Sequence, residues 1–161
     1  MNVEELRPDN SSSMTLRIIR ICHVDRKVVY DAWTNPKILK KWWGPYMFED
    51  GGSKFELKIG GRIRIEVMGF DGNIYPVIGT FMEISPPERL VFEVSPLNRK
   101  GNELFKFLIT VTFTPVIGET EVDIFVQDMG DGPEGDRYLG MMGGWWIESL
   151  GKLRNYFDNL K

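Results

Sequence analysis

The side chains best suited to chemistry in this sequence are its one cysteine and its one histidine, which stand side by side as Cys22 and His23. They fall in a stretch that alternates like a β-strand, where neighbouring side chains point to opposite faces. The two therefore cannot share a metal ion, which needs several ligands close together. A serine nucleophile would need the same histidine, and no Gly-x-Ser-x-Gly turn accompanies it. The sequence predicts no catalytic residue, no metal site and no cofactor.

Charged side chains alternate with apolar ones along the predicted strands. The glutamates inside these strands are Glu56, Glu66, Glu83 and Glu93. We expect them to face solvent, whereas a carboxylate that pointed into a dry cavity would have a raised pKa and could act as an acid or base. Arg62 and Arg64 share one strand face, where they either pair with nearby carboxylates or bind an anion.

Tryptophan is the most informative residue type. Trp33, Trp42 and Trp43 are close in sequence, and Trp145 and Trp146 are adjacent. Adjacent residues are about 100° apart around a helix, so one of the second pair can face the core while the other reaches the rim of a pocket. Indole rings suit an apolar ligand, and each offers one N–H donor to orient it. The rings either contact a ligand or fill the core.

Periodicity predicts about six or seven strands and two short helices. The first strand covers residues 14–24, and the others lie between residues 46 and 127, the clearest at 105–113. Short turns between consecutive strands favour an antiparallel sheet. The first short helix follows Asp25, which can cap it, and ends at Asn35 because the next residue is a proline. The second covers residues 37–43.

The last segment, residues 136–160, is predicted to be one long helix. Its apolar residues recur at spacings of three and four and form one stripe: Leu139, Met142, Trp146, Leu150, Leu153 and Phe157. A helix of about 24 residues is roughly 36 Å long and can cross a sheet. Three glycines, Gly140, Gly143 and Gly144, weaken it. Either they let a ligand or strand approach closely, or the helix begins only after Gly144.

This order predicts an α+β fold, in which a curved antiparallel sheet wraps around a long C-terminal helix. The 161 residues suit one domain, which we place at residues 14–161 after a polar, disordered lead-in of residues 1–13. A net charge of -3 argues against nucleic-acid binding. A single cysteine, no span long enough for a bilayer and no secretory signal together favour a cytoplasmic protein.

The chain resembles the START-like, or SRPBCC, helix-grip superfamily, and within it the family named after the activator of the heat-shock-protein-90 ATPase. The resemblance extends from Met14 to the end of the chain and is carried by the segments 28–36, 40–45, 55–62, 79–81, 85–90 and 143–146. The chain departs from the family pattern in two segments. Asp25 stands where a proline is usual, and Gln127 and Asp128 stand where a histidine is common, so no histidine chemistry is implied there.

The resemblance implies a helix-grip fold with a cavity between the sheet and the C-terminal helix. We expect a small apolar ligand there, with the mouth near Trp42, Trp43 and residues 128–135. The predicted lining is Trp42, Trp43, Ile63, Ile65, Val67, Phe107, Ile109, Val111, Met142, Trp146 and Leu150. Family members also include a chaperone-activating domain and polyketide-cyclase-like proteins, so a chaperone partner and a cyclase-like activity are the alternatives. The resemblance also implies pairing as a homodimer.

Overall fold

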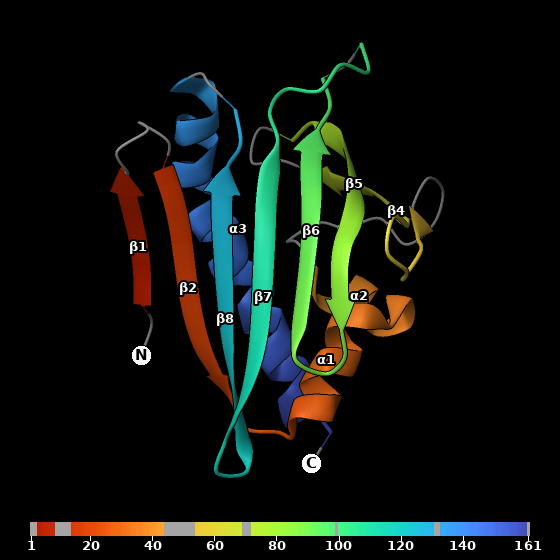
Figure 1. Ribbon diagram of the computed structural model, residues 1–161, viewed down its shortest axis with the longest axis vertical. Coiled ribbons are helices and arrows are strands. Elements are labelled where there is room, and N and C mark those ends of the chain that lie inside the picture. Colours follow the sequence, from red (N-terminus) through yellow and green to blue (C-terminus); the bar gives the residue numbers. More distant parts are fainter. Residues whose placement is uncertain are drawn as a thin grey trace.

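The computed structural model describes residues 3–8, 14–43, 54–68, 72–98, 100–130 and 133–160. Within these ranges the chain forms one antiparallel sheet and three helices (Figure 1). The elements in chain order are β1 (Val3–Pro8), β2 (Met14–Cys22), α1 (Arg26–Thr34), α2 (Pro36–Trp42), β3 (Lys54–Phe55), β4 (Arg62–Met68), β5 (Ile74–Ser85), β6 (Arg89–Pro96), β7 (Phe107–Val116), β8 (Glu119–Asp128) and α3 (Pro133–Asp158).

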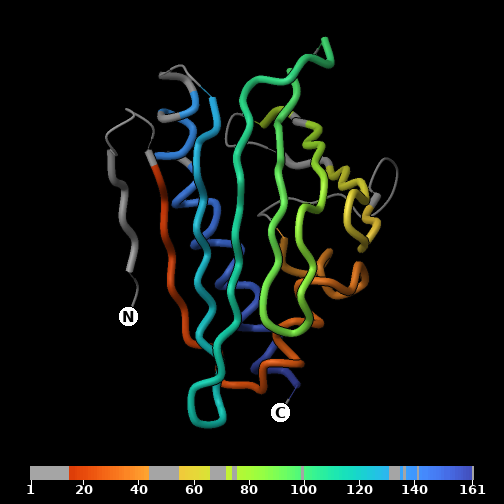
Figure 2. The backbone as a smooth tube through the Cα atoms, viewed as in Figure 1, coloured from red at the N-terminus to blue at the C-terminus, as the bar shows by residue number. Residues whose placement is uncertain are grey.

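The strand order in the sheet is β1-β2-β8-β7-β6-β5-β4-β3. The strands β3 to β8 form a meander, and the last of them returns to pair with β2, so that Ile18 lies opposite Ile124. The connection from β2 to β3 must therefore cross the sheet from one side to the other, and it carries α1 and α2. All three helices lie on the same face of the sheet, which curves around them (Figures 1 and 2).

The predicted fold class is confirmed, and the sheet has eight strands within the described residues. Two of these strands are short additions at the edges, β1 and the two-residue β3. Part of the segment predicted to be a lead-in, Val3–Pro8, forms β1 and pairs along its whole length with β2. Without β1, the edge of β2 would expose unpaired backbone groups, and such an edge readily accepts another strand.

The two short helices are defined by their caps. The Asp25 carboxylate accepts a hydrogen bond from the backbone N–H of Lys27 at the start of α1, as predicted. Asn35 ends α1 and begins α2, where its side chain accepts from the backbone N–H of Lys37. Pro36 then occupies the first turn of α2, where its lack of an N–H costs nothing.

The long helix α3 begins at Pro133 and runs without interruption through its glycines. A Cβ added at Gly140, Gly143 or Gly144 would meet nothing within 4 Å. The interpretation that the helix begins only after Gly144 is therefore wrong, and no strand among the described residues approaches these glycines closely. No helix among the described residues is both long and apolar enough to cross a membrane.

A close approach occurs instead at Gly135, where an added Cβ would overlap the carboxylate of Asp128. That carboxylate is buried at the end of β8 and accepts a hydrogen bond from the backbone N–H of Gly130, at an N···O distance of 2.9 Å. The absence of a side chain at Gly135 therefore lets the first turn of α3 pack directly against the end of β8.

Candidate functional site

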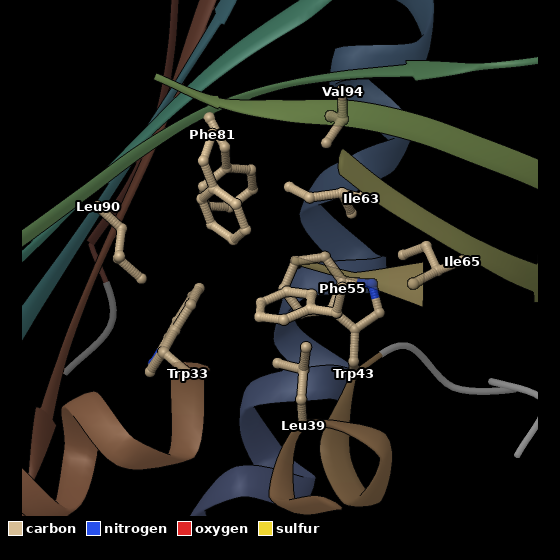
Figure 3. A pocket seen from close by; sticks show the side chains of 10 residues that line it. Trp33, Leu39, Trp43, Phe55, Ile63, Ile65, Phe81, Leu90 and Val94 are labelled. Atoms are coloured by element: carbon tan, nitrogen blue, oxygen red, sulfur yellow. The ribbon is translucent and has the colours of Figure 1, made fainter. Parts of the chain in front are cut away.

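An apolar cavity lies between the pair of short helices and the half of the sheet made by β3 to β6 (Figure 3). The helical side is formed by Trp33, Leu39 and Trp43. The strand side is formed by Phe55, Ile63, Ile65, Phe81, Leu90, Phe92 and Val94. We call these ten residues the cavity lining.

Strand alternation places the sheet residues of the lining. Ile63 and Ile65 of β4 point inward and are buried, while Arg62 is exposed and Arg64, between the two isoleucines, is half-buried. In β5 the register with β6 shifts between Phe81 and Glu83, a bulge that bends the strand. Phe81 remains inside at this bend, with 1% of its surface exposed. The sheet therefore turns its apolar face around the cavity.

Four tryptophans pack together where the helices meet the cavity. The ring centroids of Trp33 and Trp42 are 4.8 Å apart, and those of Trp33 and Trp43 are 6.2 Å apart. Trp146 of α3 stacks on Trp33 at 6.0 Å with an interplanar angle of 23°, and it meets Trp43 edge-on at 5.6 Å. We call Trp33, Trp42, Trp43 and Trp146 the tryptophan cluster. Through it, α3 holds the helical wall of the cavity in place.

The indole N–H groups of the cluster differ in their partners. Trp42 donates to the backbone carbonyl of Ala32 at an N···O distance of 2.9 Å. In a continuing helix that carbonyl would accept from residue 36, which is proline and has no N–H. The N–H groups of Trp33, Trp43 and Trp146 are buried without a hydrogen-bond partner among the described residues. Three buried donors are thus left unsatisfied around the cavity.

The cavity is small and carries no charge. Its volume is about 20 Å³, slightly more than the roughly 10–15 Å³ that one buried water needs. The looser space between its lining atoms, including the part that opens to solvent, is about 350 Å³. No residue of the lining has a titratable side chain. The arrangement can bury an apolar group, and its only side-chain polar atoms are indole nitrogens.

The structure divides the predicted ligand-contacting residues into three groups. Trp43, Ile63 and Ile65 belong to the cavity lining. The buried core, outside this lining, contains Trp42, Phe107, Ile109, Val111, Trp146 and Leu150, with the half-buried Met142 packed against it. The side chain of Val67 lies outside the described residues. No α3 residue lines this cavity, and α3 reaches it through the ring contacts of Trp146 with Trp33 and Trp43 and of Trp145 with Trp43.

Seven lining residues were absent from the sequence prediction: Trp33, Leu39, Phe55, Phe81, Leu90, Phe92 and Val94. The signal for the strand residues was present, because Leu90, Phe92 and Val94 alternate along β6. The prediction favoured β7, whose alternation is more regular, but β7 lies one strand farther from the cavity. Trp33 and Leu39 had the helical spacing of core residues, which does not distinguish a cavity wall from a filled core.

The candidate chemical groups Cys22 and His23 lie away from the cavity, at the end of β2. His23 is exposed, and its Nδ1 contacts the carboxylate of Glu119 at the start of β8. Cys22 is half-buried, and burial raises the pKa of its thiol to about 11, against a smaller opposing effect of Arg20. A thiol with a raised pKa is a poor nucleophile at neutral pH.

The strand carboxylates form cross-strand pairs on the outer face of the sheet. Glu93 lies 4.0 Å from the Lys106 ammonium, and Glu83 lies 3.3 Å from the Arg89 guanidinium. The Glu56 carboxylate accepts from the backbone N–H of Arg62. The side chain of Glu66 lies outside the described residues. Glu56, Glu83 and Glu93 are half-buried, and none of them lies in the cavity lining.

Comparison with known proteins places this fold among many similar structures. The family model described as "Activator of Hsp90 ATPase homolog 1-like protein" matches residues 23–158. A protein from Arthrobacter aurescens has a TM-score of 0.78 at 20% identity, covering 96% of this chain and 91% of its own. The AHSA1 protein of Silicibacter pomeroyi has a TM-score of 0.79 at 19% identity, with coverages of 91% and 99%. A Rhodobacter sphaeroides protein reaches 0.75 at 24% identity, with coverages of 99% and 100%. No curated protein matches the chain.

Proposed function

Because the chain belongs to the family of activator of Hsp90 ATPase homologue 1-like proteins, we propose that it binds a small apolar ligand in the cavity between the α1–α2 pair and strands β3 to β6. The observation that carries this proposal is a cavity with apolar walls and no titratable side chain in its lining. Such walls favour burial of apolar surface, worth roughly 25 cal/mol per Å² before the costs of association. They offer no acid or base for a cyclase-like reaction.

Binding requires the lining to rearrange. A ligand larger than water exceeds the cavity volume of about 20 Å³, so aromatic side chains must move aside to admit it. Phe55 is the one lining side chain that is half-buried while the other nine are buried. It comes from the short edge strand β3, which pairs with β4 through only two residues. The ligand therefore enters beside Phe55.

The direct test is native mass spectrometry of the protein purified from its own host, followed by extraction and identification of any bound molecule. We expect an apolar adduct of one ligand per chain. The proposal would be contradicted if the purified protein carries no bound molecule and its melting temperature does not change with any compound of an apolar panel.

A cavity-filling substitution makes the test specific to the site. Val94→Ile adds one methylene at a lining position, and we expect affinity for the identified ligand to fall at least tenfold while the protein stays folded. Val111→Ile adds the same group at a buried position of β7 outside the lining. We expect it to lower the melting temperature and leave affinity unchanged. Equal affinity loss in both variants would place the ligand elsewhere.

A second candidate function is partner binding, with a chaperone ATPase as the partner that the family description suggests. It is favoured by the β7–β8 turn, which projects beyond the neighbouring strands (Figure 2). Ile117 at this turn is 99% exposed and has a φ of 38°, an unfavourable conformation for a β-branched residue. Ile117→Asn should abolish ATPase stimulation and leave ligand binding intact if this turn is the contact.

Pairing as a homodimer stays a prediction, tested by analytical ultracentrifugation.

A further inference from the structure

The cavity lining combines apolar walls with unsatisfied hydrogen-bond donors. Trp33 and Trp43 both line the cavity, both are more than nine-tenths buried, and neither indole N–H has a partner among the described residues. A buried donor left without an acceptor costs about 1–3 kcal/mol. The lining side chains of the cavity can therefore donate hydrogen bonds and cannot accept them.

In the same cluster, the indole N–H of Trp42 does have a hydrogen-bond acceptor. Its N–H reaches the carbonyl of Ala32, an acceptor that the chain supplies. The described residues supply no such acceptor to Trp43, whose nitrogen lies on the side of its ring toward Ile65, another lining residue (Figure 3). An acceptor for Trp43 can therefore come from a molecule inside the cavity.

We propose that the ligand is a neutral molecule with an apolar body and a hydrogen-bond acceptor that has no hydrogen of its own, such as a ketone, ester or ether oxygen, which accepts the N–H of Trp43. This inference rests on the proposed ligand-binding function and specifies its ligand class. A hydrocarbon leaves the donor unsatisfied.

Two other classes of ligand fit less well. An alcohol can accept from Trp43, but its own hydroxyl hydrogen would be buried, and no lining side chain accepts it. A carboxylate would bring a charge among ten side chains that include no lysine, arginine or histidine. The cavity thus selects ketones over alcohols of the same shape and rejects acids.

Indane, indanone, indanol and indane carboxylate are suitable probes because they share one bicyclic body. Indanone and indanol can both accept the N–H of Trp43, but only indanol buries a hydroxyl hydrogen for which the lining side chains offer no acceptor, so their affinities should differ by the cost of that lost hydrogen bond. By titration on the unmodified protein, we expect indanone to bind about fivefold more tightly than indanol, the equivalent of one net hydrogen bond. We expect no saturable binding of the carboxylate.

The substitution Trp43→Phe removes the donor and keeps an aromatic ring. We expect it to reduce the ratio of indanone affinity to indane affinity about fivefold. The matched control is Trp145→Phe, because Trp145 meets Trp43 edge-on at 5.4 Å but does not line the cavity. This control should leave the ratio unchanged.

A second readout uses the unmodified protein and does not depend on the variant folding. In proton–nitrogen correlation spectra, indanone should move the indole N–H resonance of Trp43 downfield, and indane should not. Binding of indane and indanone with neither a Trp43 shift nor a loss of preference in the variant would overturn this inference alone. Binding of no probe at all would overturn the proposed function together with it.

Discussion

Some buried polar side chains of this protein have a hydrogen-bond partner and others do not. This difference decides how much the free energy of unfolding changes when the polar group is removed. Trp42 and Tyr30 are both buried, but only Trp42 has a hydrogen bond from its polar atom. Its indole N–H donates to the carbonyl of Ala32, which cannot accept from residue 36 because that residue is a proline. The Tyr30 hydroxyl has no partner in the part of the chain that the structure describes, although its ring packs edge-on against Phe113 with centroids 5.5 Å apart.

The paired substitutions Trp42→Phe and Tyr30→Phe should therefore have different effects. The first leaves the Ala32 carbonyl unsatisfied and opens space in the core, so we expect the free energy of unfolding to fall by about 2–4 kcal/mol. The second removes a buried, unpartnered hydroxyl, so we expect a change smaller than about 1 kcal/mol or a slight gain. Denaturant titration measures both, and equal losses would mean that the Tyr30 hydroxyl has an acceptor in solution.

Cys22 should make stability depend on pH in the alkaline range. Burial raises the pKa of its thiol from 9.0 to about 11, so the unfolded chain gives up this proton at lower pH than the folded chain does. The contribution is fully present below pH 9 and is lost as pH rises toward 11. The slope approaches about 1.4 kcal/mol per pH unit in that window.

The control for this pH dependence is Cys22→Ala, which has no thiol to titrate. Burial also raises the pKa of Tyr30, so part of the alkaline loss should remain in the variant. Urea titrations of both proteins from pH 8 to 11 give the difference in slope. Parallel curves would show that the Cys22 thiol titrates alike in the folded and unfolded chains.

At the scale of one element, α3 contains glycines in two different environments. Gly140, Gly143 and Gly144 face open space, so nothing in the structure compensates for their low helix propensity. Gly135, in the first turn, has the carboxylate of Asp128 where a Cβ would lie. The same residue type therefore weakens the middle of the helix and is required at its start.

Alanine substitutions should separate these environments. Gly140→Ala and Gly144→Ala should each raise the free energy of unfolding by up to about 1 kcal/mol, because alanine favours the helix and restricts the unfolded chain. Gly135→Ala should lower it by about 1–3 kcal/mol, because the buried Asp128 carboxylate must move. Thermal denaturation reports all three, and destabilisation by Gly144→Ala would indicate a contact in solution on that face of α3.

For the whole molecule, the sequence predicted the fold better than the cavity. Local signals were sufficient for the element order, for the Asp25 cap and for the inward positions of Ile63 and Ile65. The location of the cavity depends on a long-range arrangement, because the β2-to-β3 connection brings Trp33 and Leu39 beneath strands far along the chain. Periodicity marks which side chains point inward, but it does not indicate which inward side chains pack too loosely to fill the space.

We propose residues 14–161 as the domain that folds independently, with β1 covering the edge of the sheet. Deletion of residues 1–13 should preserve cooperative unfolding and the circular dichroism of the peptide backbone. It should also expose the edge of β2, so we expect larger species in sedimentation velocity runs at high protein concentration. Loss of cooperative unfolding would mean that the pairing of β1 with β2 is needed for the fold itself.

The closeness of the tryptophan rings also has an optical consequence. Trp33, Trp42, Trp43 and Trp146 all lie within 6.2 Å of another member of the cluster, and Trp145 lies 5.0 Å from Trp146. All five tryptophans of the chain are therefore near enough to pass excitation from ring to ring. Light absorbed by any of them migrates through the group before it is emitted. A quencher that touches Trp43 alone would dim nearly all of the protein's ultraviolet fluorescence, so the unmodified chain carries its own reporter of cavity occupancy.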